Sequence, residues 1–361
     1  MAPLPAAGFG PPVVAVLGDR FAMNERSALV VTSISKPNWI LEELSAGCRK
    51  NDLEFILIGD ESSPSDFFLD GCQYYSLEKQ HETGFEFARR CPTKHYARKN
   101  IGYLIAIQNG ASTLAETDDD NIPYPNFWLP RTRRQSAPTL AQAGWVNVYS
   151  YFSDFNIWPR GLPLQHVKDK PPIFESLDTA DVDCPIQQGL VNENPDTDAI
   201  FRLVSELPQS FRGDRRIALT NGSWCPFNSQ STVWWKDAFP LMYLPAYCSM
   251  RMTDIWRGFI AQRIAWTNNW GVLFHEPNFR QERNEHVLIN DFKDEVPGYL
   301  NNSDLCKALD SLSLKPGMNN LLDNLRLCYE KLVNAGFMDG KELGLVDAWA
   351  SDVSQINRSV S

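Results

Sequence analysis

The first sixty residues contain two continuous apolar runs separated by a segment with helical spacing. The runs cover residues 28–32 and 55–58, and between them Pro37-Asn38 precedes a regular set of apolar side chains. These are Ile40, Leu41, Leu44 and Cys48. Continuous apolar runs are typical of buried parallel strands, and a spacing near 3.6 residues is typical of a helix. The pattern therefore predicts a strand–helix–strand unit with a right-handed crossover.

A second helix and a third strand follow. Ile101, Leu104 and Ile105 share one helical face, and Gly110 suits the position just after a helix end. The short strand-like run 112–115 then leads into an acidic sequence. This alternation predicts an α/β fold with a Rossmann-like, mostly parallel sheet flanked by helices, in which ligands bind at the carboxyl edge of the strands.

The acidic sequence is Glu116-Thr117-Asp118-Asp119-Asp120, directly after the third strand. Carboxylates this close repel one another unless a cation lies among them. Ligand sets made only of oxygen suit a hard divalent ion such as Mg²⁺ or Mn²⁺. We therefore predict Asp118 and Asp120 as metal ligands and Asp119 as part of the cofactor site. The alternative is an acidic loop that only faces solvent.

The loops after the first two strands carry no glycine fingerprint and no G-K-[ST] sequence, which disfavours the common dinucleotide and P-loop modes of binding. Thr32 and Asp60 end these strands, and we predict that they hold a nucleoside. A turn-forming role is the alternative for Asp60. Lys94, Arg98 and Lys99 lie where the second helix begins, the unfavourable end for cations unless an anion docks there. Arg98 and Lys99 are predicted diphosphate ligands, with a solvated basic face as the alternative.

The amino-acid composition of the chain argues against several classes of function. The net charge is −10 and no basic run interrupts it, which argues against nucleic-acid binding. The eight cysteines form no C-x-x-C pair, so zinc and redox motifs are disfavoured. No stretch approaches the ~20 apolar residues of a membrane helix, and we expect a soluble or peripheral protein of a reducing compartment such as the cytoplasm. The many Trp and Phe residues fill a core or provide platforms for sugars and bases.

Several long sequence words resemble the STELLO family, glycosyltransferase-like proteins of the plant Golgi. They span much of the chain and keep the same order: residues 98–111 (RKNIGYLIAIQNGA), 157–164 (IWPRGLPL), 187–191 (QQGLV), 195–203 (PDTDAIFRL), 226–232 (PFNSQST) and 253–263 (TDIWRGFIAQR). A weaker similarity runs to the reversibly glycosylated polypeptides, or UDP-arabinopyranose mutases, which share a three-Asp motif and an Asp-x-Trp-x-Gly block.

The resemblance implies a GT-A type fold in which a D-x-D motif binds a divalent ion and a nucleotide-diphosphate sugar. We expect an N-terminal extension over residues 1–27, a catalytic domain over 28–300 and a C-terminal helical appendage over 301–361. UDP is the expected nucleotide, again from the resemblance. The plant proteins are anchored in the Golgi membrane, which adds the Golgi lumen as an alternative compartment if an anchor is missing from this chain.

Three residues in the second half of the chain are candidates for a catalytic or binding role. Asp254 begins the helical word 253–263 and is predicted to take the proton of an acceptor hydroxyl, which would make transfer inverting. Helix capping is the alternative for Asp254, and Arg257 either binds the donor phosphate or pairs with Asp254. His275 follows the strand-like run 271–274 and is a predicted third metal ligand by resemblance, with a satisfied core histidine as the alternative.

Neutral polar groups complete the predicted sugar site. Trp158-Pro159-Arg160 either lines a sugar pocket or forms a packing corner, and Asn228-Ser229-Gln230 offers donors and acceptors suited to hydroxyl groups. The predicted function is a metal-dependent glycosyltransferase that moves a sugar from a nucleotide-diphosphate donor to a glycan or other hydroxyl acceptor. A nucleotide-sugar mutase of the same fold and a non-catalytic scaffold for a polysaccharide synthase are the competing hypotheses.

Overall fold

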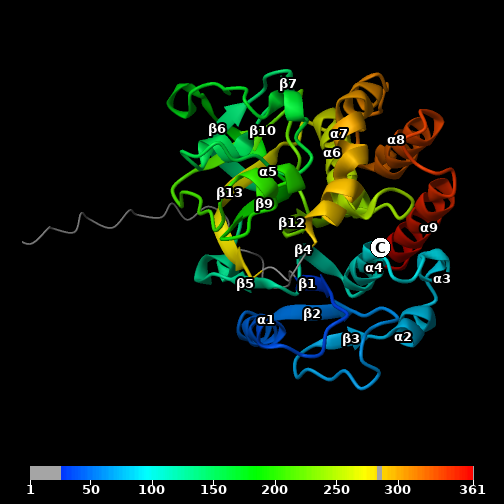
Figure 1. Ribbon diagram of the computed structural model, residues 1–361. Coiled ribbons are helices and arrows are strands. Elements are labelled where there is room, and N and C mark those ends of the chain that lie inside the picture. Colours follow the sequence, from blue (N-terminus) through cyan, green and yellow to red (C-terminus); the bar gives the residue numbers. More distant parts are fainter. Residues whose placement is uncertain (1–25, 283–286, 361) are drawn as a thin grey trace, which may run out of the picture.

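A computed structural model describes residues 26–282 and 287–360, and it has an extended central sheet with helices packed against it (Figure 1). The strands are β1 (Arg26–Thr32), β2 (Leu53–Ile58), β3 (Gln73–Tyr75), β4 (Ala111–Thr117), β5 (Asn121–Pro123), β6 (Arg134–Leu140), β7 (Gly144–Trp145), β8 (Thr179–Asp183), β9 (Ile186–Asn192), β10 (Arg216–Leu219), β11 (Ser223–Trp224), β12 (Ser231–Trp235) and β13 (Val272–Gln281). The α-helices are α1 (Trp39–Lys50), α2 (Leu77–Glu82), α3 (Glu86–Arg90), α4 (Lys99–Gln108), α5 (Ala199–Val204), α6 (Thr253–Thr267), α7 (Leu288–Asp310), α8 (Leu321–Asn334) and α9 (Glu342–Val360). Short 3₁₀ helices include η1 (Tyr96–Arg98), η2 (Pro125–Trp128), η6 (Lys236–Met242) and η7 (Met250–Met252).

The first half of the sheet is parallel, as its apolar runs predict. The strand order begins β3-β2-β1-β4, and all three pairs run parallel. The predicted strands 28–32 and 55–58 lie within β1 and β2, and Leu29 pairs with Phe55 in register. Asn38 accepts a hydrogen bond from Leu41 N and caps α1, the predicted crossover helix. The strand–helix–strand prediction is confirmed.

The second half of the sheet is mixed. It continues β12-β9-β13-β10-β6-β8, with β12 antiparallel to both β4 and β9, and β13 parallel to β9 and antiparallel to β10. Strand β12 lies beside β4 although the chain passes through β5 to β11 and α5 between them. The predicted α/β class with a helix-flanked sheet and C-terminal helices is confirmed, and this arrangement is consistent with a GT-A type fold.

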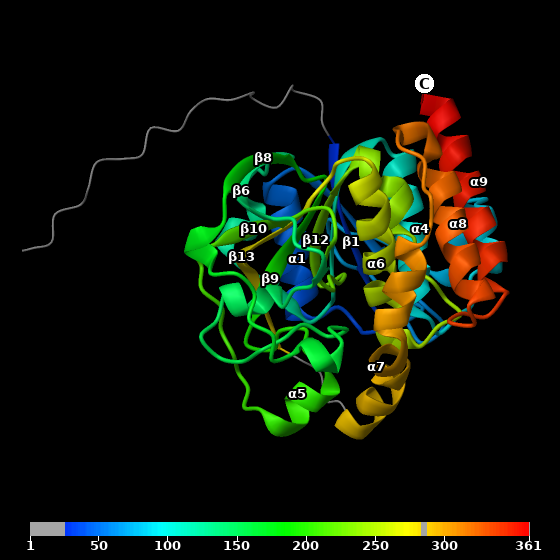
Figure 2. The same cartoon turned by 90° about the horizontal axis from the view of Figure 1, so that it is seen from above.

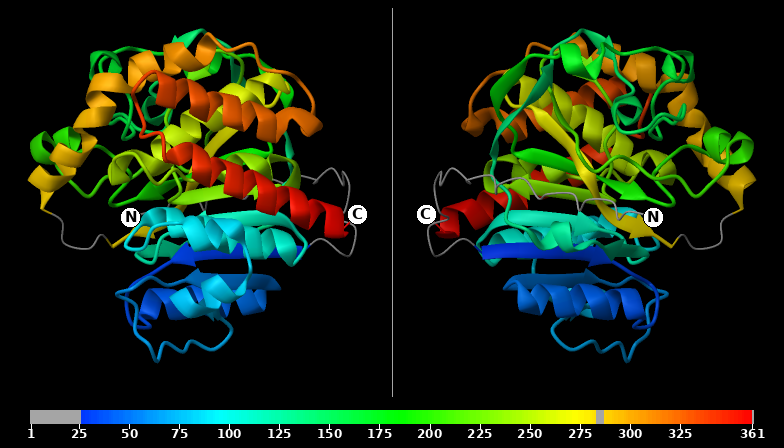
Figure 3. Two further views of the ribbon diagram at one scale, coloured as in Figure 1. Left: turned by 90° about the vertical axis from the view of Figure 1, so that its right-hand side faces the viewer. Right: turned by 90° about the vertical axis from the view of Figure 1, so that its left-hand side faces the viewer.

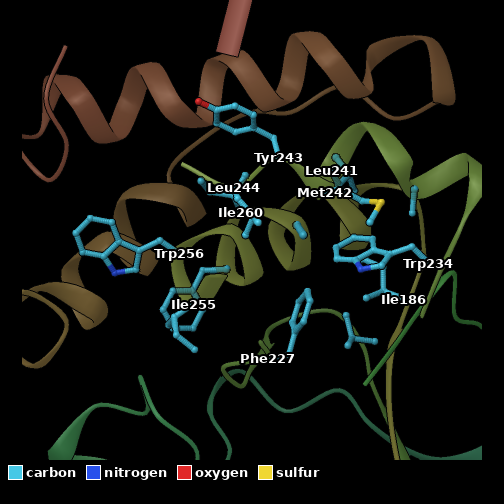
Figure 4. Close-up of a cluster of buried hydrophobic side chains, with 14 of the residues drawn as sticks. Ile186, Phe227, Trp234, Leu241, Met242, Tyr243, Leu244, Ile255, Trp256 and Ile260 are labelled. Carbon is cyan, nitrogen blue, oxygen red and sulfur yellow. The ribbon is translucent and has the colours of Figure 1, made fainter. Parts of the chain in front are cut away.

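Two cores of unequal size cover the two faces of the sheet. On one face α1 buries Leu41 and Leu44 against β1 and β2. On the other face α4 packs against the same strands. Helix α6 packs over Trp234 and Phe227, and Figure 4 shows these two side chains near Ile255 and Ile260 of α6. Seen from above, α4, α6, α7, α8 and α9 lie together beside the sheet (Figure 2). The chain therefore places its larger apolar core under the C-terminal helices.

The C-terminal helices pack on the rest of the molecule as well as on one another. Helix α8 contacts α6, and α9 contacts α3 and α4 (Figure 3). The domain division stays a prediction: the boundary drawn at residue 300 falls inside α7, and almost all of segment 1–27 lies outside the described residues. Among helices in the described ranges, none has the length and apolar composition needed to cross a bilayer.

The close approach of α4 to the sheet makes a test of this packing. A Cβ atom on Gly102 would lie 2.5 Å from Val30 Cγ1 and 2.9 Å from Ile58 Cγ1. We expect Gly102→Val to lower the free energy of unfolding by about 1–3 kcal/mol, because a well-packed core tolerates added volume poorly. The measurement is urea denaturation followed by circular dichroism.

Gly213→Ala is the matched control, because nothing lies within 4 Å of its added Cβ. It should change the unfolding free energy by less than about 0.5 kcal/mol. Equal stability of the Gly102→Val variant and the control would contradict the packing described for α4.

Candidate active site

A cleft of about 450 Å³ opens at the carboxyl edge of the parallel strands. It is bounded by residues that follow β1, β2 and β4 and by the segments that begin α4 and α6. Among its lining residues are seven that the sequence analysis predicts as site residues: Thr32, Asp60, Arg98, Asp118, Asp119, Asp120 and Asp254. The structure thus brings together residues that lie up to 222 positions apart in the chain, from Thr32 to Asp254.

The acidic loop, residues 118–120, forms one wall of the cleft. Asp118 Oδ1 accepts a hydrogen bond from the Tyr96 hydroxyl at 2.8 Å, and Asp119 accepts one from Ser33 Oγ. Both oxygens of Asp120 lie 3.1 Å from Gln281 Nε2. Burial raises the pKa of Asp119, and the neighbouring charge of Asp118 raises it further. The loop is therefore a set of crowded, oriented carboxylates that a cation would stabilise.

Lys99 lies beneath this loop and does not line the cleft. Its side chain is 0% exposed, and its ammonium donates to Thr117 O at 2.7 Å, to the Tyr96 hydroxyl at 2.7 Å and to Asp118 Oδ1 at 3.3 Å. An ammonium group has three protons to donate, and these three acceptors use all of them. The sequence analysis predicts Lys99 as a phosphate ligand, whereas the structure places it as an internal counter-charge for the end of β4.

Arg98 has the opposite environment. It is 1% exposed yet lines the cleft, and its Nε and Nη1 donate to neutral acceptors, Gln80 Oε1 at 2.9 Å and Cys91 O at 3.0 Å. Its Nη2 has no hydrogen-bond partner among the described residues. Burial lowers the pKa of Arg98, because the charged guanidinium loses its contact with water. No carboxylate in the described part of the chain contacts the charge closely enough to offset this effect. A buried guanidinium with an unused donor at a helix start is suited to an anion.

Asp60 lines the cleft next to Arg98, but local backbone groups already engage it. Its Oδ1 accepts from Glu61 N at 2.7 Å and its Oδ2 from His95 N at 3.0 Å. These bonds orient the carboxylate and hold the segment before α4 against the end of β2. Lone pairs remain on both oxygens for a ligand.

Asp254 faces the acidic loop from the start of α6 and takes part in a buried ion-pair cluster. Its two oxygens accept from Arg160 Nη2 at 3.1 and 2.9 Å, and the residue is 7% exposed. Arg160 also binds Asp196 through two bonds of 2.8 and 2.9 Å. Burial alone would raise the pKa of Asp196, but Arg160 lowers it to about 2. One arginine therefore pairs with two carboxylates at this wall.

Arg251 is a cleft residue that the sequence analysis misses. Its Nε and Nη2 donate to Glu295 Oε1 at 3.0 and 2.7 Å, and Glu295 is a fully buried residue of α7. Tyr96 and Asp196 also line the cleft without having been predicted. Arg160 and Gln230 also line the cleft, and they lie in the segments Trp158-Pro159-Arg160 and Asn228-Ser229-Gln230, which the sequence offers for a sugar pocket and for hydroxyl groups.

Two other predicted residues do not reach the cleft. Arg257 is 1% exposed and forms a 2.8 Å ion pair with Glu116, which is 0% exposed. His275 lies on β13 with its ring 3% exposed, and its Nδ1 contacts Glu276 O at 2.9 Å. Burial lowers the pKa of His275 well below its usual value, and Arg131 lowers it further. Successive side chains of a strand point to opposite faces, and those of a helix point in different directions around its axis. Both Arg257 and His275 occupy positions that face the interior of the protein.

A divalent ion fits the acidic loop only in part. The described residues contain no group of three or more His, Cys, Asp or Glu side chains arranged to hold a metal ion. Asp118 and Asp120 line the same cleft and offer oxygen ligands, so an ion there would need further oxygens from a ligand such as a diphosphate or from water. The residues present fit a shared, ligand-assisted site better than a closed metal site.

Comparisons with known proteins agree with the resemblance noted in the sequence. The family described as STELLO glycosyltransferases matches residues 251–360. Two proteins of Arabidopsis thaliana, named "Probable glycosyltransferase STELLO1" and "Probable glycosyltransferase STELLO2", are each 27% identical to this chain. The matches cover 95% and 91% of this chain but 46% and 44% of those proteins, so the chain spans about half the length of the curated relatives that it matches.

A solved structure entitled "Crystal Structure of a Mycobacterial Protein" superposes with a TM-score of 0.42 at 7% sequence identity, covering 77% of this chain and 75% of that chain. The sequence matches confirm the predicted resemblance to the STELLO glycosyltransferases.

The placement of Arg257 generates a stability prediction. Arg257→Met leaves the fully buried Glu116 without its charged partner, so we expect the free energy of unfolding to fall by about 3–5 kcal/mol. Arg326→Met serves as the control because Arg326 is 40% exposed and pairs with Glu330 and Asp347 at the surface. The control should lose no more than about 1 kcal/mol. Chemical denaturation measures both, and an unaffected Arg257→Met variant would contradict the buried pair.

Proposed function

We propose that this STELLO-like chain is a glycosyltransferase whose cleft binds a nucleotide-diphosphate sugar and transfers the sugar to a hydroxyl acceptor such as a glycan. The observation that carries the proposal is the convergence of Thr32, Asp60, Arg98, the acidic loop and Asp254 on one cleft. Open α/β sheets bind ligands at this edge. The similarity to proteins named probable glycosyltransferases supports the same class of reaction.

The donor would lie along the carboxyl edge from β2 toward α6. Thr32 and Asp60 would hold the nucleoside, and the unused Nη2 of Arg98 would bind a phosphate oxygen. Asp118 and Asp120 would hold Mn²⁺ or Mg²⁺ together with diphosphate oxygens. Such an ion, when bound, neutralises the charge that develops on the leaving diphosphate. UDP is the proposed nucleotide on the family resemblance, and Asp119 would add charge beside the ion.

Asp254 is the proposed general base. Arg160 Nη2 binds both oxygens of its carboxylate, and in our proposal the sugar end of the donor would lie beside it. A carboxylate in that place accepts the proton of the attacking hydroxyl, which corresponds to an inverting reaction. Arg251 would present a further donor to the acceptor or to the diphosphate.

The competing hypotheses make different predictions for the same cleft. A nucleotide-sugar mutase would bind the donor and isomerise its ring without an acceptor, and a scaffold would bind no donor. Incubation with a panel of nucleotide sugars and Mn²⁺, followed by mass spectrometry, separates them. Transfer or slow donor hydrolysis is the expected result. Ring isomerisation would replace the proposal with the mutase, and the absence of any donor binding would leave the scaffold. The compartment, cytoplasm or Golgi lumen, stays a prediction.

Binding of UDP should depend on the acidic loop and on a divalent ion. We expect isothermal titration calorimetry to show that Mn²⁺ strengthens UDP binding at least about tenfold, because a metal bridges carboxylates and phosphates. Asp118→Asn and Asp120→Asn should each abolish this gain, and chelation with EDTA should do the same for the unaltered protein. Equal UDP affinity with and without Mn²⁺ would refute the metal-assisted site.

The role of Arg98 predicts a difference between two ligands. Arg98→Met should weaken UDP binding by about 10- to 100-fold, because a hydrogen bond to a charged group contributes about 1.5–3 kcal/mol. Uridine, which has no phosphate, should bind the variant and the unaltered protein about equally. Calorimetry measures both ligands, and a parallel loss for uridine and UDP would show that the substitution disturbs the fold instead.

A further inference from the structure

The Tyr96 hydroxyl lies at the meeting point of the two walls of the cleft. It is 2.7 Å from Lys99 Nζ, 2.8 Å from Asp118 Oδ1 and 2.7 Å from Ser229 Oγ. Ser229 in turn reaches Asp254 Oδ2, with its Oγ at 3.4 Å and its backbone N at 3.3 Å. A continuous path of two hydroxyl groups therefore joins the acidic loop to the proposed base. None of these contacts enters the binding roles proposed above.

Counting protons along this path leaves two arrangements. Lys99 has no lone pair, so the Tyr96 oxygen accepts from it, and the single Tyr96 proton goes either to Asp118 or to Ser229. If it goes to Asp118, the Ser229 proton points back to Tyr96 and Asp254 receives nothing from that hydroxyl. If it goes to Ser229, the Ser229 proton is directed to Asp254.

The distances match the first arrangement. The Tyr96–Asp118 and Tyr96–Ser229 contacts are short, at 2.8 and 2.7 Å, whereas the Ser229–Asp254 contact is long, at 3.4 Å. A cation that takes up the Asp118 oxygen removes the acceptor for the Tyr96 proton. The Tyr96 proton then turns to Ser229, and the Ser229 hydroxyl turns to Asp254. No proton leaves any residue in this change, so its charge balance is complete.

We infer that Tyr96 and Ser229 are positioning residues that transmit the occupancy of Asp118 to Asp254 through a reversible hydrogen-bond relay. The relay would add the Ser229 hydroxyl to the donors that orient the proposed base, beside Arg160, only when a cation occupies the acidic loop. This inference rests on the proposed function for its role in transfer, but the relay itself requires only a cation at Asp118. It assigns Lys99 a second task, because its fixed donation to Tyr96 is what restricts the hydroxyl to two arrangements.

NMR of the side-chain carboxyl carbon of Asp254 tests the relay directly. The protein is labelled with [4-¹³C]aspartate, the Asp254 resonance is identified by its loss in Asp254→Asn, and Mg²⁺ is added alone. Mg²⁺ should shift this resonance in the unaltered protein but not in Tyr96→Phe or Ser229→Ala. Tyr103→Phe is the matched control, because it removes another buried hydroxyl, one that donates to Glu116 away from the cleft. The Asp254 resonance of the control should shift as in the unaltered protein.

Two results would overturn the relay: an Asp254 resonance that Mg²⁺ leaves unmoved in the unaltered protein, or one that moves equally in Tyr96→Phe and Ser229→Ala. Thermal melting of each variant shows whether it is folded, and Ser229→Ala keeps the test available if Tyr96→Phe is unstable. The NMR experiment does not need UDP. A failure of nucleotide binding would therefore count against the proposed function, while the NMR result could still be interpreted.

Turnover of a nucleotide sugar provides an independent measure. Each single substitution should lower kcat about tenfold with KM unchanged, since a misoriented base loses part of its ~10²–10⁴-fold contribution. The Tyr96→Phe/Ser229→Ala double variant should be no slower than the slower single variant, because both break one path. A roughly hundredfold loss in the double variant would show two independent roles and contradict the relay.

Discussion

The structure depends on how the charge of the acidic loop is compensated. Three consecutive aspartates end β4 beside a second acidic wall, and such a concentration of negative charge opposes folding unless cations lie close to it. Lys99 supplies one positive charge from beneath, where it is fully buried against Thr117 and Asp118. Arg160 supplies another at the opposite wall. The loop is thereby held in place while part of its charge remains uncompensated, and that remainder is the basis of the cation site that we propose.

Helices α6 and α7 take part directly in this arrangement. Glu295 of α7 holds Arg251 at the cleft, and α6 presents Asp254 from its first turn. The segment that matches the STELLO glycosyltransferases, residues 251–360, contains both of these contributions. Arg251, Asp254 and the helices that hold them therefore belong to one continuous piece of sequence, whereas Arg160 and Asp196 of the same wall come from earlier in the chain.

The sequence predicts those parts of the site that follow from strand ends. Thr32, Asp60 and Asp118 each come directly after an apolar run, and because parallel strands end at one edge, their convergence could be expected. Arg160, Asp196 and Arg251 come from segments without helical or strand periodicity, so only long-range packing brings them to the cleft.

The direction in which a side chain points is the second feature of the site that the sequence does not predict. Arg98 and Lys99 are adjacent at the start of α4, yet the helical turn sends one to the cleft and the other under the loop. Arg257 and His275 were predicted as ligands by residue type and position along the chain. Their environments are instead decided by partners far away in sequence, Glu116 for the arginine and the buried surroundings of β13 for the histidine.

The central claim is that a cation and a nucleoside diphosphate share the acidic edge of this sheet. Crystals grown with UDP and Mn²⁺, with data collected at the manganese absorption edge, test it most directly. The account predicts an anomalous peak between Asp118 and Asp120, with the diphosphate of UDP between that peak and Arg98. A manganese peak at another place, such as His275, or UDP bound outside this cleft would contradict it.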